Sequence, residues 1–126
     1  MGYCWGGWVI GKYSSIENTP ITCGISFHPS WRVEDVVEGY GKGQKMGQQI
    51  RVPQLLLTAK DDSPYLKPGG AVEGDLMRKP FKSKARVFPE MRHGWVNRGD
   101  LSDPAIDRDF HAAWDEEALP FLQDHF

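Results

Sequence analysis

The chain of 126 residues carries 15 Lys and Arg against 17 Asp and Glu, which gives a formal net charge of -2 with both signs interspersed. This balance excludes the basic surface of a nucleic-acid-binding protein, and the length allows one domain with a hydrophobic core. No apolar run approaches the roughly 20 residues needed to cross a bilayer, and the N-terminus has no signal-peptide pattern. We therefore expect a single domain over residues 1–126, located in the cytoplasm, with a small-molecule partner and with neither nucleic acid nor a membrane.

The first predicted element is a helix over residues 5–12 that follows a very sharp turn at Cys4. The stretch GYCWGG at residues 2–7 surrounds the cysteine with three glycines, which tolerate positive φ and a close approach of backbone segments. The chain has one other cysteine, Cys23, and neither has a second Cys or His at metal-ligand spacing. Cys4 is therefore either a thiol with a chemical role or a small core residue, and we assign Cys23 to the core.

Two buried strands are predicted next, over residues 21–27 and 54–59. The first is rich in β-branched and apolar residues and ends at His-Pro-Ser, whereas the second follows a proline and ends at a polar turn. The segment between them is charged and contains several glycines. We expect a short helix over residues 33–38 and then a mobile surface loop over residues 39–49.

The last third of the sequence predicts a helix, a strand and a second, longer helix. Apolar residues recur at helical spacing within residues 67–79, and residues 85–88 form a strand that ends at Pro89. Asp103-Pro104 then begins a long amphipathic helix, because proline is favourable in the first turn. Pro120 should kink or interrupt this helix near its end.

The order of these elements predicts the fold class. Helices alternate with strands, which is typical of an α/β fold with three layers, α-β-α, around a mostly parallel sheet. Sites in such sheets gather at the carboxyl ends of the strands. Asp61 directly follows the strand over residues 54–59, and His93 follows the strand over residues 85–88. If Cys4 also follows a strand, these three side chains converge.

The residues around Cys4 are typical of a nucleophile elbow, a tight turn from strand to helix in which small residues flank the catalytic side chain. The helix beyond the turn directs its unpaired N–H groups toward the sulfur, which favours the thiolate, and the backbone N–H of Trp5 would stabilise an oxyanion. Cys4, Asp61 and His93 also keep the chain order of nucleophile, acid and histidine. His93 would take the thiol proton, and Asp61 would hold the imidazole tautomer.

Plainer interpretations stand beside these. His93 is alternatively an ordinary loop histidine. Either Asp61 or its neighbour Asp62 is alternatively a turn residue, and we favour Asp61 for the acid because it comes directly after the strand. His28 follows a strand at the same edge of the sheet, so it lines the pocket or simply ends the strand.

Aromatic and basic loop residues extend the candidate site. Trp5, Trp31 and Trp95 are placed to wall an apolar substrate pocket, whereas Trp8 and Trp114 are expected in the core. Arg98 is a candidate substrate ligand or, alternatively, a loop clamp that pairs with Asp100.

Three segments together resemble the dienelactone hydrolases (carboxymethylenebutenolidases), which are cysteine members of the α/β-hydrolase fold. They are GYCWGG, VPQLLLTAKDDSPYLKP and FPEMRHGWVNRGD. The resemblance implies that the chain corresponds to the C-terminal half of that fold. It further implies that Cys4, Asp61 and His93 hydrolyse a small lactone or ester through an acyl-enzyme without metal or cofactor, and that Arg98 binds a substrate carboxylate.

In that family the strand that leads into the elbow, a second oxyanion donor and an acidic residue beside the resting cysteine lie upstream of the elbow. We therefore expect an N-terminally truncated hydrolase domain. The alternative function is an inactive fragment that acts as an interaction module and self-associates through an exposed sheet edge. A thiol redox protein has less support, because no resolving cysteine stands near Cys4.

Overall fold

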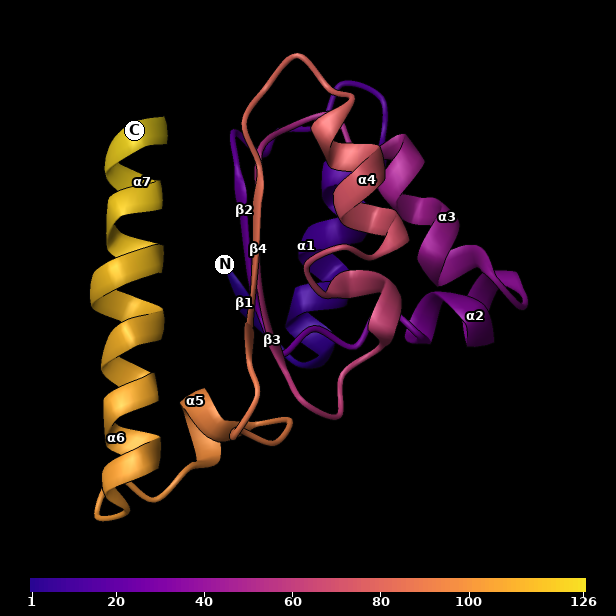
Figure 1. Cartoon of the computed structure of the whole chain (residues 1–126). Helices are drawn as coiled ribbons and strands as arrows, with labels where there is room; N and C mark the ends of the chain where they lie inside the picture. Colours follow the sequence, from indigo (N-terminus) through magenta and orange to yellow (C-terminus); the bar gives the residue numbers. More distant parts are fainter.

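The protein is built around a sheet of four parallel strands, as described by a computed structural model of residues 1–126. The strands lie side by side in the order of the chain, β1-β2-β3-β4, and helices cover both faces of the sheet (Figure 1). Their bounds are Gly2–Tyr3 for β1, Gly24–Phe27 for β2, Gln54–Ala59 for β3 and Lys84–Phe88 for β4. This three-layer arrangement confirms the predicted α/β fold class.

The helices form two groups, one on each face of the sheet (Figure 1). The first group comprises α1 (Trp5–Ser15), α2 (Val33–Glu38), α3 (Lys42–Gln49), the 3-10 turn η1 (Pro64–Leu66) and α4 (Ala71–Met77). The second comprises α5 (Trp95–Arg98), α6 (Pro104–His111), the π-helix η2 (Ala112–Ala118) and α7 (Leu119–His125). None of these helices combines the length and the apolar character that crossing a membrane requires.

Strand β3 supplies apolar side chains to both faces of the sheet. Leu55 and Leu57 belong to the core that includes residues of α5, η2 and α7, whereas Leu56 belongs to the core shared with α3 and α4. Successive side chains of a strand point to opposite faces. A strand buried on both faces therefore needs a continuous apolar run, which is the pattern that predicted it.

Most elements lie close to their predicted positions, and those at 33–38 and 54–59 are confirmed with the expected bounds. Helix α1 continues three residues beyond the predicted end at residue 12, and strand β2 begins at Gly24, later than the predicted residue 21. The short strand β1 lies at the edge of the sheet. Self-association through that edge stays a prediction.

The predicted surface loop over residues 39–49 is wrong, because most of it forms helix α3. Gly43, Met46 and Gly47 are buried along one side of this helix. A Cβ at residue 43 would lie 2.6 Å from the carbonyl oxygen of Trp31, and one at residue 47 would lie 3.2 Å from the Val72 side chain. These glycines permit close packing of the helix and do not mark a loop.

The long C-terminal helix begins as predicted and ends differently. Asp103 caps α6 by accepting a hydrogen bond from the backbone N–H of Ala105 at 2.9 Å, and Pro104 occupies the first turn. Of the two expected outcomes at Pro120, an end to the helical conformation is not found, because the chain stays helical to His125 (Figure 1). A π-helix over Ala112–Ala118 directly precedes the proline. Its wider turns relieve the clash that proline causes in an α-helix.

Replacing Gly11 with alanine should destabilise the protein by about 1–3 kcal/mol, because its new Cβ would overpack the core. That Cβ would lie 2.6 Å from ring atoms of Trp31, which is fully buried. Gly6→Ala is the matched control in the same helix, since its Cβ would meet nothing within 4 Å. It should stabilise by about 0.5–1 kcal/mol through helix propensity. Urea unfolding of both variants measures the difference, and equal midpoints would contradict the packing argument.

Candidate active site

Cys4 occupies the turn between β1 and α1 in a backbone conformation that is uncommon for a residue with a side chain. Its φ is 49° and its ψ is -116°. The backbone N–H of Cys4 donates to the carbonyl of Phe27 at 3.1 Å, and its own carbonyl accepts from the N–H groups of Ser30 and Gly7, both at 3.0 Å. Such strain persists only where the surrounding structure fixes it. The hydrogen bonds to the end of β2 and its following loop provide that fixation.

Two of the three glycines around Cys4 are required sterically. A Cβ at Gly2 would lie 2.3 Å from the backbone of Gly6, and a Cβ at Gly7 would lie 2.8 Å from the Pro29 side chain. Gly6 has open space around it. The elbow therefore depends on close backbone approach at residues 2 and 7, as expected for a strand-to-helix turn that presents a side chain at the sheet edge.

Three side chains from distant parts of the sequence surround the sulfur of Cys4. His28 Nδ1 lies 3.2 Å from Cys4 Sγ, and Arg98 Nη2 lies 3.9 Å from it. A ring nitrogen of His93 lies within 4.8 Å of both the sulfur and a ring nitrogen of His28. The loops after β2 and β4, together with α5, thus bring His28, His93 and Arg98 to the elbow. Cys4, His28 and His93 are also the residues whose donor atoms are close enough to share a metal ion.

The carboxylate that contacts the His93 ring is that of Asp62, whereas the favoured Asp61 contacts the His93 backbone. Asp62 Oδ1 lies 2.6 Å from His93 Nδ1, and Asp62 Oδ2 accepts the backbone N–H of Ala59 at 2.6 Å. Asp61 is exposed and accepts the backbone N–H of His93 at 2.7 Å. The turn after β3 directs one carboxylate inward and its neighbour outward. Burial raises the pKa of Asp62, while its hydrogen bonds with Ala59 and His93 oppose that shift.

The raised pKa of Cys4 favours its neutral thiol form. Burial raises the pKa of Cys4, the positive charge of Arg98 lowers it, and the negative charge of Asp62 raises it. The net upward direction differs from the thiolate that the helix end by itself would favour. Cys4 would therefore need a neighbouring base to become a thiolate near neutral pH. Trp5 is the first residue of α1, so its N–H belongs to the helical turn that has no intrahelical acceptor.

His28 is more closely involved with Cys4 than the sequence indicated. Its residue exposure is 0%, and its φ of 39° makes it a second strained residue beside Cys4. Burial is the main cause that lowers the pKa of His28 to about 4, and His93 contributes. The imidazole is therefore neutral at pH 7. Its Nε2 atom has no hydrogen-bond partner.

The buried His28 should make the protein less stable in mild acid. The unfolded chain binds the proton with a pKa near 6.5, whereas burial lowers the pKa of His28 in the folded chain to about 4. The contribution of His28 to the free energy of unfolding is therefore fully present above pH 6.5. It falls as the pH drops toward 4, with a loss of up to about 2 kcal/mol near pH 5. Asp62 acts in the opposite direction, because its folded pKa is raised.

Urea unfolding of the wild type and of His28→Gln across this pH range separates the two groups. The wild type should lose more stability on acidification than the variant, whatever the absolute stability of each. An equal loss in both proteins would refute a buried neutral His28.

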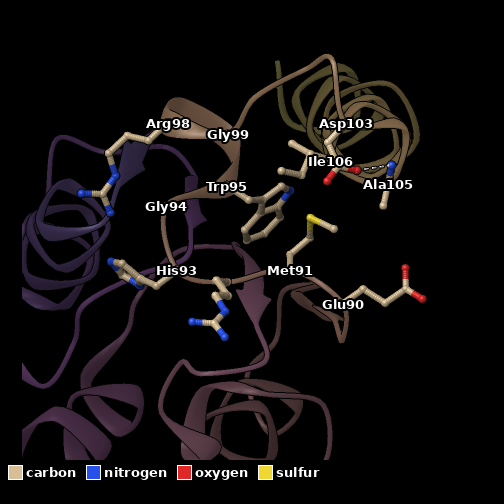
Figure 2. A pocket seen from close by; sticks show the side chains of 11 residues that line it. Glu90, Met91, His93, Gly94, Trp95, Arg98, Gly99, Asp103, Ala105 and Ile106 are labelled. Atoms are coloured by element: carbon tan, nitrogen blue, oxygen red, sulfur yellow. Dashed lines mark hydrogen bonds between the residues drawn. The ribbon is translucent and has the colours of Figure 1, made fainter.

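Two open cavities flank His93, and Cys4 lines neither of them. The first, of about 350 Å³, includes Trp95 and Arg98, and the second, of about 330 Å³, is polar and includes Ser30 and Asp62. Figure 2 shows the His93 and Arg98 side chains on one side of their loop and the Trp95 side chain on the other. Because the cavities meet at His93, a ligand held in either one would lie beside the histidine.

The division of the tryptophans between pocket and core differs in part from the expectation. Trp95 is buried, with 4% exposure, and packs edge-on against His28, whereas Trp5 is 60% exposed beside the elbow. The expectation that Trp31 walls the pocket is wrong, because Trp31 is fully buried and donates to the carbonyl of Gly7 at 3.0 Å. Trp8 and Trp114 pack against the two cores as expected.

One unexpected contact of His93 and one expected contact of Arg98 that is not formed complete the description of the site. Ser30, which the sequence did not single out, places its Oγ 3.5 Å from His93 Nε2. Its only sequence signal is its position just after strand β2. The alternative clamp between Arg98 and Asp100 is not formed, because Asp100 accepts from Ser102 and Arg98 extends toward Cys4.

Comparison with known proteins places the chain in a family, and the family agrees with the nucleophile-elbow geometry at Cys4. No curated protein and no solved structure gives a match to this sequence. A model of the dienelactone hydrolase family matches residues 1–125. The match spans the elbow, the acidic turn after β3 and the histidine loop after β4. The chain therefore belongs to the dienelactone hydrolase family, within the α/β-hydrolase superfamily.

Proposed function

We propose that this protein is a hydrolase that cleaves a small lactone or carboxylic ester, with Cys4 as nucleophile, His93 as general base and acid, and Asp62 as the residue that orients His93. The contact between Asp62 and His93 Nδ1, beside the strained Cys4 elbow, is the observation that carries the proposal. Nucleophile, base and orienting acid are the three components of a hydrolytic triad.

In the first half of the reaction, the sulfur attacks the carbonyl carbon of the ester. His93 Nε2 accepts the thiol proton, and the N–H of Trp5 stabilises the oxyanion. Asp62 keeps Nδ1 protonated, so that Nε2 presents its lone pair. His93 then protonates the leaving alkoxide as the C–O bond breaks, which leaves an acyl-cysteine.

Water completes the cycle. His93 removes a proton from water, the resulting hydroxide adds to the thioester carbonyl, and the sulfur leaves to recover the thiol. Cys4 and His93 must approach each other for the first step, since the present contact of His93 Nε2 is with Ser30 at 3.5 Å. Catalytic hydrogen bonds often tighten only when substrate binds.

Arg98 indicates the class of substrate. Its guanidinium is near the sulfur, and Arg98 is among the residues that line the first cavity beside His93. A guanidinium pairs with carboxylates through parallel hydrogen bonds. We therefore propose that the preferred substrate is an ester or lactone that carries a carboxylate.

Hydrolysis of paired substrates tests the function. Small activated esters and lactones that carry a carboxylate are compared with their neutral analogues, with and without prior treatment with iodoacetamide. Turnover should favour the carboxylates and stop on alkylation, with the label mapped to Cys4 by peptide mass analysis. Turnover that survives complete alkylation of Cys4 would refute the mechanism.

A further inference from the structure

The three nitrogen and sulfur donors at the elbow have the arrangement of an incomplete metal site. Their donor atoms all lie within 4.8 Å of one another, and the pair from Cys4 and His28 is already at 3.2 Å. In a tetrahedral zinc site with Zn–S near 2.3 Å and Zn–N near 2.0 Å, neighbouring donors are about 3.5 Å apart. The pair from Cys4 and His28 already has nearly this spacing, and an inward shift of His93 would complete the set.

The surroundings of the two histidines suit metal binding. His28 is fully buried, and its Nδ1 is directed at the sulfur. His93 bonds Asp62 through Nδ1, which leaves Nε2 with only the long contact to Ser30. A carboxylate on the far nitrogen of a ligating histidine fixes its tautomer and strengthens it as a ligand. Asp62 would thus orient His93 for metal binding in the same way as it orients His93 in the proposed triad.

The composition of the cluster selects the class of metal. One thiolate and two imidazoles suit Zn²⁺ and similar borderline transition-metal ions, whereas Mg²⁺ and Ca²⁺ prefer oxygen ligands. Three protein ligands leave a fourth position for water. Arg98 opposes binding, because its positive charge lies near the sulfur. The site should therefore bind such a metal reversibly.

We propose that Cys4, His28 and His93 form a binding site for Zn²⁺ or a similar transition-metal ion, and that metal binding excludes hydrolysis. On binding, the Cys4 thiol releases its proton to solvent, the thiolate and the two neutral imidazoles coordinate the ion, and water completes the coordination shell. The metal then occupies the nucleophile and the base together. The inhibitory effect rests on the proposed function, whereas the binding site stands independently of it.

Cobalt substitution tests the site without any measurement of activity. Co²⁺ added to the purified full chain should give a thiolate-to-metal charge-transfer band and the strong visible absorption of tetrahedral Co²⁺, both displaced by Zn²⁺. Cys4→Ala should abolish the charge-transfer band. His28→Gln and His93→Gln should weaken binding at least tenfold, and Asp62→Asn should weaken it by about 10–100-fold. Cys23→Ser and His111→Gln are matched controls that should bind like the wild type.

Arg98→Met separates the metal site from the substrate site. It should strengthen Co²⁺ binding by removing a positive charge, whereas it should weaken hydrolysis of carboxylate-bearing substrates. Absence of the charge-transfer band in the wild type, or its persistence in Cys4→Ala, would overturn the metal site. Circular dichroism confirms that each variant is folded.

Hydrolysis measured in EDTA and with added Zn²⁺ then tests exclusion. Zn²⁺ should inhibit and EDTA should restore turnover, and full activity with the metal bound would overturn exclusion. Spectroscopic binding without hydrolysis in EDTA would refute the proposed function alone. Hydrolysis in EDTA without any cobalt spectrum would refute the metal site alone.

Discussion

Replacing Cys4 with alanine should reduce hydrolysis of the best carboxylate-bearing ester by roughly 10⁴-fold or more, because no acyl-enzyme can form. The sulfur is the only nucleophile held in the strained elbow, and the side chains of His28 and Arg98 converge on it. The alanine variant should keep the fold, since alanine is smaller and the backbone hydrogen bonds of residue 4 remain. Steady-state kinetics measures kcat/KM, and mass spectrometry should detect an acylated wild type but no acylated variant.

Cys23→Ser is the matched control for this change. Cys23 is partly buried beside the core and lies outside the elbow, so its substitution should leave kcat/KM within a few-fold of the wild type. Cys4→Ser should retain little activity, because a hydroxyl has a much higher pKa than a thiol and is a weaker nucleophile. Full activity in Cys4→Ala would rule out the proposed nucleophile.

Replacing Asp62 with asparagine should lower kcat by about 10³–10⁴-fold with little change in KM, because the imidazole is then held in the wrong tautomer. The amide oxygen of asparagine can keep the hydrogen bond from the Ala59 N–H, which Asp62 accepts at 2.6 Å. Its NH₂ group then faces His93 Nδ1 and donates to it. The proton of the neutral imidazole is forced onto Nε2, which can no longer accept the thiol proton.

Asp61→Asn provides the control at the adjacent position. Asp61 accepts the backbone N–H of His93 at 2.7 Å, and an amide oxygen can do the same. The kcat of this variant should stay within about tenfold of the wild-type value, because the hydrogen bond to the His93 backbone is kept. A larger loss of kcat in Asp61→Asn than in Asp62→Asn would restore the original preference for Asp61 and contradict the assignment made from the structure.

The predicted elements were confirmed where a strong local signal, such as a helix cap or an apolar run between breakers, lies in the sequence. Strand β3 contains three consecutive leucines between a proline and a polar turn, and α6 begins with an aspartate cap and a proline. Helix α3 was missed because its glycines carry a loop signal in the sequence. In the folded protein Gly43 lies against Trp31, where a side chain would not fit, and Gly47 packs closely against Val72. Local helix propensity does not reveal that a glycine is required for close packing against a segment distant in sequence.

The choice between two adjacent aspartates illustrates the same limit for the site. Asp61 and Asp62 have the same chemistry, and both lie in the turn after β3. The turn that closes with the N–H of Asp62 donating to the carbonyl of Ala59 at 3.3 Å decides which carboxylate faces His93. Position relative to the strand end favoured Asp61, whereas the contact with His93 Nδ1 is made by Asp62.

The sequence by itself determined the α/β class, the elbow at Cys4, the loop that carries His93 and the resemblance to dienelactone hydrolases. The α/β class follows from the order of helices and strands along the chain, whereas the elbow is specified by one short segment whose small residues meet a steric requirement. Only the tertiary structure placed His28 on the sulfur, Asp62 on His93 and Ser30 beside Nε2. These contacts join residues at least 24 positions apart, and their geometry depends on parallel strands bringing several loops to one edge of the sheet.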